Sequence, residues 1–311
     1  MGAVNRIMIT GASGFIGQAT IAAALKAGLE VVAVQRHASA RRDGVHSFAA
    51  DLTSPDCVSV LQDALAQCDS VIHLAAAMSG APEDHKRLTL GGTEHVLTAM
   101  ARAGVGHLTL ASSIAVFDTI QVPIGGDLTD DCVLENPAMS RDAYSGAKVR
   151  QENMARAARL NSLTIVRPGI VYDRSRIWNA HLGVRLGPIL LRIGDDSPLP
   201  MCDVNRCAGA LVQATLRAET VTFSVVDETL PTRGHVISVN KRFGGPIFVI
   251  PLPWQVPWVV ARALRPMSGK LPGLLRENVL RQRCLPMGIR LAPPPFSATL
   301  PQTRFDAEGL S

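Results

Sequence analysis

Short apolar runs alternate with longer stretches of helical spacing through the first two thirds of the chain. The apolar runs begin at residue 6 and return at 30–34, 46–52, 71–75, 107–111 and 162–166. Helical spacing or alanine-rich sequence fills the intervals at 15–27, 55–67, 83–103 and 141–160. Continuous apolar strands separated by helices of this length are typical of βαβ units. The pattern therefore predicts an α/β fold with a doubly wound parallel sheet covered by helices on both faces.

This alternation ends after Pro168. Residues 174–200 are irregular and rich in glycine and proline, and residues 203–217 have helical spacing again. Short strands, prolines and basic residues follow from Val221. We expect an α/β domain over residues 1–168 and a smaller, substrate-binding C-terminal lobe over residues 169–311.

Composition indicates a folded chain and restricts the kinds of partner it could bind. Hydrophobic residues make up 47% of the 311 residues and charged residues 18%, which excludes a disordered chain. The net charge is +5, and the excess lies after residue 240, where ten basic residues face three acidic ones. A basic C-terminal quarter indicates an anionic partner. Nucleic acid is a poor candidate, because aromatic residues are only 4% and do not interleave with a basic stripe.

The cysteines and the N-terminus point to a cytoplasmic protein. The six cysteines are scattered without a C-x-x-C pair, so we expect free thiols and no metal site. A strand-like run begins by Arg6 without a preceding apolar h-region and cleavage site, so we expect no signal peptide.

One segment raises the question of a membrane. Phe243 to Ala261 is 19 residues without a charge, long enough on paper for a membrane span. Its four prolines would break a helix repeatedly, so a span is disfavoured. Peripheral docking on a membrane surface, assisted by the basic residues that follow, is the alternative we retain.

The loop after the first strand has the composition of a phosphate cradle. Thr10-Gly-Ala-Ser-Gly-Phe-Ile-Gly17 places glycines at 11, 14 and 17 between a strand and a helix. Three glycines permit a tight turn, a close approach of the backbone to a pyrophosphate, and close packing of the helix on the strand. The helix N-terminus then faces the phosphates. The loop therefore predicts dinucleotide binding.

The glycine spacing and four later motifs resemble the extended short-chain dehydrogenase/reductase superfamily, the NAD(P)-dependent epimerase/dehydratase-like branch. The later motifs are His73-Leu-Ala-Ala76, Ala111-Ser-Ser-Ile-Ala-Val-Phe117, Tyr144-Ser-Gly-Ala-Lys148 and Arg167-Pro-Gly-Ile-Val-Tyr172. Asp51-Leu52 also resembles the family's adenine-contacting pair. The resemblance implies a Rossmann domain and a homodimer formed through the helices at 83–103 and 141–160. The cofactor-binding residues that it implies are Gly11, Ser13, Gly14, Phe15, Ile16, Gly17, Arg36, Asp51, Leu52, Leu74, Ala75, Ala76, Tyr144, Lys148, Pro168, Gly169, Ile170 and Val171.

The residues after the second strand indicate which nicotinamide cofactor binds. NAD-binding proteins commonly carry an acid there, whereas an arginine accommodates the 2′-phosphate of NADP. Here the strand ends in Gln35-Arg36-His37, and Arg41 and Arg42 follow. We therefore expect NADP, with NAD as the alternative.

Tyr144 and Lys148 form the expected catalytic pair. They stand four residues apart, so they share one face of a helix. A cation near a phenol favours the phenolate and lowers its pKa, which suits acid–base work near neutral pH. By family resemblance, Lys148 also holds the nicotinamide ribose, and Ser113 holds the substrate oxygen, with Ser112 beside it.

The reaction expected from the family is hydride transfer to a carbonyl or from a secondary alcohol. Family dehydratases carry an Asp–Glu pair after the catalytic hydroxyl, but Ile114 and Ala115 stand there, so a dehydratase is rejected. Arg36 favours a reductase over an epimerase that retains NAD. A sugar-nucleotide epimerase and a non-catalytic NAD(P)-binding protein remain alternatives. The segment Val225 to Arg233 resembles members tied to polysaccharide biosynthesis.

The substrate expected from these features is an anionic nucleotide- or lipid-linked sugar. Arginine side chains bind diphosphates well. The candidate substrate residues are Met78, Ser112, Arg174, Arg176, Trp178, His181 and Arg185. Met78 to Leu90 is expected to form a loop beside the cofactor that acts as a lid. Thr89 stands where many family members have asparagine, in Thr89-Leu-Gly-Gly-Thr93.

Overall fold

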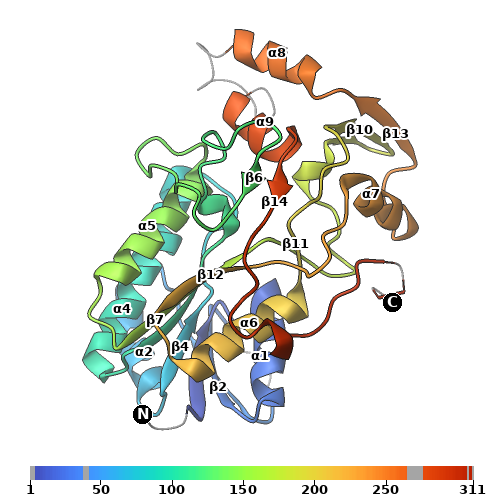
Figure 1. Ribbon diagram of the computed structural model, residues 1–311. Coiled ribbons are helices and arrows are strands. Elements are labelled where there is room, and N and C mark those ends of the chain that lie inside the picture. Colours follow the sequence, from blue (N-terminus) through green and yellow to red (C-terminus); the bar gives the residue numbers. More distant parts are fainter. Residues whose placement is uncertain (1–3, 38–41, 265–275, 307, 310–311) are drawn as a thin grey trace.

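The computed structural model describes residues 4–37, 42–264, 276–306 and 308–309. Its centre is a seven-stranded sheet in the order β12-β7-β5-β4-β1-β2-β3, and every pair in it is parallel (Figure 1). The strands are β1 (Arg6–Thr10), β2 (Glu30–Gln35), β3 (Val45–Ala49), β4 (Ser70–His73), β5 (His107–Ala111), β7 (Ser162–Pro168) and β12 (Val221–Val225). The predicted doubly wound parallel sheet is confirmed.

Helices cover both faces of this sheet. The first face carries α1 (Phe15–Lys26) and α6 (Val204–Arg217), and the second carries α2 (Cys57–Leu65), α4 (Gly92–Ala103) and α5 (Ala143–Ala157). Successive residues of β1 point to opposite faces, so Ile7 and Ile9 join the first core while Met8 joins the second. A strand buried on both sides reads as a continuous apolar run, which is why the sequence pattern was informative.

Two elements beyond residue 168 belong to the central sheet. Strand β12 pairs with β7, and α6 packs on α1. The predicted boundary at residue 168 therefore divides elements that share one sheet, because the chain leaves the sheet after β7 and later returns to it.

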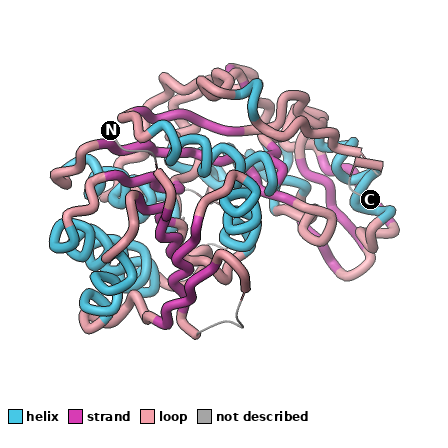
Figure 2. The backbone as a smooth tube through the Cα atoms, turned by 90° about the horizontal axis from the view of Figure 1, so that it is seen from below, coloured by secondary structure: helices cyan, strands magenta, loops and turns pink. Residues whose placement is uncertain are grey.

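The remaining elements form a lobe beside the carboxyl ends of the strands. Figure 2 shows its strands to the right of the central sheet. The strands are β6 (Asp127–Leu128) paired with β14 (Gly288–Ile289), β8 (Ile170–Tyr172) paired with β11 (Met201–Asp203), and a sheet of β9 (Val184–Leu186), β10 (Ile189–Ile193) and β13 (Phe248–Leu252). The helices are α7 (Arg233–Arg242), α8 (Gln255–Ala263) and α9 (Glu277–Cys284).

The segment expected to form a lid is largely helical. Helix α3 (Pro82–Asp84) continues through a π-helical stretch, His85–Gly91, directly into α4. Only the residues between β4 and α3 are irregular, so the lid prediction is wrong for residues 82–90. A π-helical insertion inside a helix is frequent at functional sites, and this one lies against α5.

Three further observations concern the described residues. All six cysteines are free thiols. No group of three or more His, Cys, Asp or Glu side chains within the described ranges could hold a metal ion. None of the helices described is long and apolar enough to cross a membrane.

Candidate active site

The glycine loop has the shape that its composition predicts. Gly11 has a φ of +67°, and a Cβ there would lie 2.9 Å from the amide nitrogen of Ala75. A Cβ on Gly17 would lie 2.7 Å from the carbonyl oxygen of Ala12, so the helix could not pack on the loop. Helix α1 begins at Phe15 without a side-chain cap at Gly14, which leaves its first amide groups available to a ligand. Ser13, Phe15 and Ile16 lie in this loop and first turn. The loop therefore fits a pyrophosphate.

Arg36 and Asp51 lie close together beyond the carboxyl ends of β2 and β3. Arg36 is exposed directly after β2. Hydrogen bonds from the amide and hydroxyl groups of Thr53 lower the pKa of Asp51, with a smaller contribution from the charge of Arg36. Leu52 is buried. Arg42 is described and exposed, whereas Arg41 lies outside the described residues.

The other predicted cofactor residues line the same edge of the sheet. Leu74, Ala75 and Ala76 follow β4, and the amides of the first two point to the Thr10 hydroxyl oxygen at 3.3 and 3.4 Å. Pro168 ends β7, and Gly169, Ile170 and Val171 lead into β8. A Cβ at Gly169 would collide with the carbonyl oxygen of Pro200, because β11 passes there. Parallel sheets bind ligands at this edge.

Ser113 and Tyr144 are brought together as predicted. Ser113 lies near enough to Tyr144 for its hydroxyl to lower the pKa of the phenol, and the Ser113 oxygen accepts from the amide of Ala115 at 3.1 Å. Burial raises the pKa of Tyr144, and the Ser113 hydroxyl only partly opposes this. The sequence led us to expect a lowered pKa from Lys148, so the direction differs. Desolvation of the phenol is the physical reason.

The Lys148 side chain is nearly fully buried and bound to two neutral acceptors. Its ammonium donates to the carbonyl oxygen of Ala111 and to Oε1 of Gln151, both at 2.8 Å. Burial lowers the pKa of Lys148 to about 8, although the charge of Glu152 opposes the change. The ammonium is therefore held at the end of β5, where Ser112 and Ser113 follow in the chain.

A buried polar network connects Lys148 with the glycine loop. Gln151 donates to the Thr93 hydroxyl at 2.8 Å, Thr93 lies 3.0 Å from Nε2 of His73, and Nδ1 of His73 lies 2.6 Å from the Thr10 hydroxyl. Burial, with the nearby charge of Lys148, lowers the pKa of His73 to about 3, so this imidazole is neutral. Sequence reasoning missed Thr93 and Gln151 as members of this network, although both lie on the inner faces of their helices.

Two buried ion pairs, Glu152–Arg167 and Glu135–Arg141, make hydrogen bonds with residues 112–117. Ser112 donates to Glu152 at 2.6 Å, and Arg167 binds the same carboxylate at 2.8 and 2.9 Å. Burial alone would raise the pKa of Glu152, but Arg167 and Ser112 hold it below its usual value. The hydroxyl of Ser112 is thus occupied inside the protein, and nothing in its surroundings favours the predicted role in substrate binding. Arg141 binds Glu135 and the carbonyl oxygens of Ala115 and Phe117.

The π-helical stretch contributes two buried polar side chains, Thr89 and His85, near the candidate site. Thr89 accepts from the amide of Ala77 at 3.0 Å, so a hydroxyl supports the loop after β4. His85, in the π-helical stretch, is buried with its ring centroid 6.2 Å from that of Tyr144. Its Nδ1 has no hydrogen-bond partner among the described residues.

The predicted substrate residues separate into different regions. The Arg176 guanidinium lies 4.6 Å from the ring centroid of Phe15, which places it at the start of α1 beside the glycine loop. Arg174 lies over Phe243, and Met78 is 73% exposed on the loop after β4. Arg185 lies over Trp178 and donates to the carbonyl oxygens of Gly187 and Gly244, so the lobe's outer sheet holds it.

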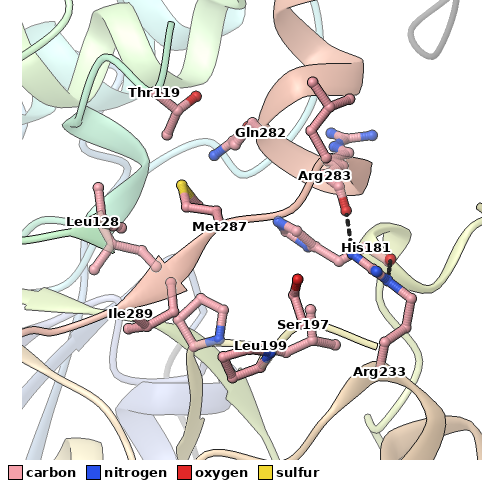
Figure 3. Close-up of a pocket in the computed structure, with 14 residues that line it drawn as sticks. Thr119, Leu128, His181, Ser197, Leu199, Arg233, Gln282, Arg283, Met287 and Ile289 are labelled. Atoms are coloured by element: carbon pink, nitrogen blue, oxygen red, sulfur yellow. Dashed lines mark hydrogen bonds between the residues drawn. The ribbon is translucent and has the colours of Figure 1, made fainter. Parts of the chain in front are cut away.

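A small cavity that is open to solvent lies between the end of the central sheet and the C-terminal lobe, and Ile114, the residue after Ser113, lines it (Figure 3). Its lining is mostly apolar and includes Ile114, Leu128, Leu199, Met287 and Ile289. His181 also lines it. Burial, followed by the charges of Arg283, Arg233 and Arg141, lowers the pKa of His181 to about 3. The cavity therefore combines apolar walls with a positive potential at one end.

Comparison with known proteins agrees with this geometry. The sequence pattern of the NAD dependent epimerase/dehydratase family matches residues 7–177, which is more than half of the chain. The chain belongs to this family. The resemblance to extended short-chain dehydrogenases/reductases is thus confirmed.

Individual relatives of this epimerase/dehydratase family member catalyse different reactions. It is 27% identical over 201 residues to a 2-alkyl-3-oxoalkanoate reductase of Stenotrophomonas maltophilia, a match that covers 62% of this chain and 59% of the relative. It is 27% identical over 160 residues to a UDP-glucose 4-epimerase of Streptomyces lividans, covering 48% and 46%. The chain therefore matches less than two thirds of either relative.

A solved structure shows the same fold. The Thermus thermophilus UDP-glucose 4-epimerase in complex with NAD superposes with a TM-score of 0.59 at 22% identity, covering 80% of this chain and 86% of that one.

Proposed function

We propose that this protein is an NADP-dependent reductase that uses Ser113, Tyr144 and Lys148 to reduce a carbonyl or oxidise the corresponding alcohol. The observation that carries the proposal is the proximity of Ser113 to Tyr144, close enough for its hydroxyl to lower the pKa of the phenol, one helical turn from the buried ammonium of Lys148. When bound, a nicotinamide cofactor supplies or accepts the hydride.

The roles of the three residues follow from their contacts. Ser113 Oγ holds the carbonyl oxygen in place, and Tyr144 Oη donates the proton that this oxygen gains on reduction. Because burial raises the pKa of Tyr144, the phenol stays protonated at neutral pH and ready to donate. Lys148, one turn further along α5, carries a positive charge that stabilises the phenolate left behind.

The preference for NADP rests on Arg36. Its exposed guanidinium follows β2, where the 2′ position of an adenine ribose would lie, and the sequence has no acid between Glu30 and Asp43. Arg176, beside the first turn of α1, adds positive charge near the pyrophosphate site.

The cavity supports a substrate with an apolar portion. Its walls are mainly aliphatic, and the cations around His181 favour a negatively charged group at one end. An oxo acid with an alkyl chain, the class named for the Stenotrophomonas maltophilia relative, satisfies both properties. The anionic nucleotide- or lipid-linked sugar expected from the sequence satisfies the second.

Nucleotide analysis tests the cofactor. The protein is denatured, the released nucleotide is identified, and stripped protein is titrated with NADPH and NADH. We expect exchangeable binding with a preference for NADPH that Arg36→Ala reduces. Tightly held NAD would refute the preference and favour a sugar-nucleotide epimerase.

Substrate screening tests the reaction. NADPH consumption is followed with 2-alkyl-3-oxo acids of increasing chain length and with keto-sugar nucleotides, using Tyr144→Phe as the inactive control. Turnover that rises with chain length supports the apolar cavity, and turnover of keto-sugars alone contradicts it. A Tyr144→Phe protein as active as the wild type would refute the catalytic assignment.

A further inference from the structure

One face of the small C-terminal sheet is apolar and open to solvent. The strand register aligns Leu186, Ile189 and Phe248 in one row across β9, β10 and β13. The next row is Val184, Leu191 and Ile250. Aligned residues in neighbouring strands share a face, so both rows point to the same side. Leu186 is 57% exposed, Phe248 61% and Ile250 49%.

The other parts of this sheet are covered by packed side chains, so exposure is confined to one region of it. On the opposite face, Leu190 and Val249 pack into a core with Tyr172 and Val236. At one end of the open face, a third row of Ile193 and Leu252 is covered by α8 and α9. Val184 also packs against this cluster, so the uncovered part of the face consists of Leu186, Phe248 and Ile250, with Ile189 and Leu191 half-buried between them.

Helix α8 also carries exposed apolar side chains. Val256, Val259 and Val260 have i, i+3, i+4 spacing, so they share one face of the helix, and each is exposed by more than two fifths. Strand β13 leads into α8 through Pro253 and Trp254. With Ile247, seven of the fourteen exposed large apolar side chains in the described residues lie on β9, β13, α8 and their connections. Such concentrations mark interaction surfaces.

Positive charges predominate around these elements. The sequence from Thr229 to Arg276 contains seven basic residues and no acidic one. Lys241 and Arg242 are exposed at the end of α7, just before β13, and Arg262 is exposed in the last turn of α8. The acids that follow β10 are paired, Asp195 with Arg233 and Asp196 with Arg192.

We propose that this surface, formed by β9, β13 and α8, binds peripherally to an anionic phospholipid membrane. The exposed apolar side chains enter the interface, and Lys241, Arg242 and Arg262 contact anionic headgroups. A second copy of the chain fits less well, because a two-fold interface would bring two copies of the same positively charged surface together. The proposal is independent of the reaction at Tyr144.

The tryptophans of the wild-type chain are intrinsic fluorescent probes of this surface. All three tryptophans, Trp178, Trp254 and Trp258, lie in this lobe. Trp254 and Trp258 touch edge to face, and the guanidinium of Arg262 lies 5.2 Å from the Trp258 ring centroid. Insertion of this region into lipid therefore changes the intrinsic fluorescence without any substitution.

The experiment mixes the full-length protein with vesicles of phosphatidylcholine, alone or with phosphatidylglycerol. We expect co-sedimentation, a blue shift of tryptophan emission and quenching by brominated lipid with the anionic vesicles. Added salt should weaken binding. Absence of both co-sedimentation and spectral change with anionic vesicles at low salt would overturn the proposal.

Two double variants separate the contributions. Replacing Lys241 and Arg242 with glutamine should weaken binding about 30-fold, since each basic residue contributes about fivefold. Phe248→Ser with Ile250→Ser should weaken binding to anionic vesicles at least tenfold, at about 0.8 kcal/mol per CH₂ group withdrawn from lipid.

The matched control is Val133→Ser with Met139→Ser, exposed apolar residues outside the lobe. Circular dichroism checks that each variant is folded. Equal loss of binding in the control would contradict the assignment. Dissociation of a wild-type dimer by Phe248→Ser, without vesicle binding, would identify the surface as a contact between copies instead.

Discussion

The burial of Lys148 makes the stability of this protein depend on pH in a defined way. The side chain is 3% exposed, and burial lowers its pKa from 10.5 to about 8. The proposed role of Lys148 requires a charge held out of water, so its thermodynamic consequence can be measured without knowing the substrate.

The magnitude follows from the displaced pKa. One pKa unit corresponds to about 1.4 kcal/mol, so the charged lysine costs the folded state about 3 kcal/mol relative to the neutral amine. This cost is fully present below pH 8. Between about pH 8 and 10.5 the unfolded chain holds a proton that the folded chain has released, so the free energy of unfolding rises with pH. From pH 7 to 9.5 the wild type should gain about 2 kcal/mol relative to Lys148→Met.

The assay is urea unfolding of wild type and Lys148→Met, both free of nucleotide, at the two pH values. The quantity of interest is the change with pH in the difference between their free energies of unfolding. Lys26→Met is the control, because it removes an exposed ammonium at the end of α1. A wild-type-to-Lys148→Met difference that stays constant with pH would refute the burial of this ammonium.

Three further predictions concern the cofactor and the reaction. Tyr144→Phe should lower kcat about 10²- to 10⁴-fold while NADPH affinity, measured by fluorescence, changes only a few-fold. Arg176→Gln should weaken NADPH binding about 5- to 30-fold, because it removes a cation near the pyrophosphate, whereas Arg174→Gln should have little effect; equal effects would argue against this placement. Gly17→Ala should destabilise the fold and abolish nucleotide binding, since its Cβ would press on the glycine loop, while Gly91→Ala, with space around it, should be tolerated in thermal unfolding.

Several features of the candidate site were predictable because they depend on local patterns. Strands buried on both faces read as apolar runs, and the glycine loop has a spacing that its own backbone demands. Tyr144 and Lys148 share a helix face through the geometry of α5 alone. Local geometry also explains why the start of α6 was anticipated within a residue, since Asp203 caps it through the amides of Asn205 and Arg206.

The arrangement of the substrate side was decided by the tertiary structure. Arg176 reaches the start of α1, and Arg185 lies on the outer sheet, although only eight residues separate them in the chain. Irregular segments carry no periodicity that indicates where they pack, so position depends on pairings such as β8 with β11. Ser112 and Ser113 are adjacent, yet Ser112 donates to Glu152 whereas Ser113 lies near Tyr144 and lowers the pKa of its phenol.

The pKa shifts of Tyr144 and Lys148 likewise could not be predicted from the sequence. From the spacing of Tyr144 and Lys148 we expected the lysine charge to lower the pKa of the phenol. In the structure, burial raises the pKa of the phenol and lowers that of the amine. Desolvation depends on every atom that covers a group, and those atoms come from β5, α5 and the π-helical stretch together. The sequence by itself determined which groups could react, and the tertiary structure decided the dielectric surroundings in which they do so.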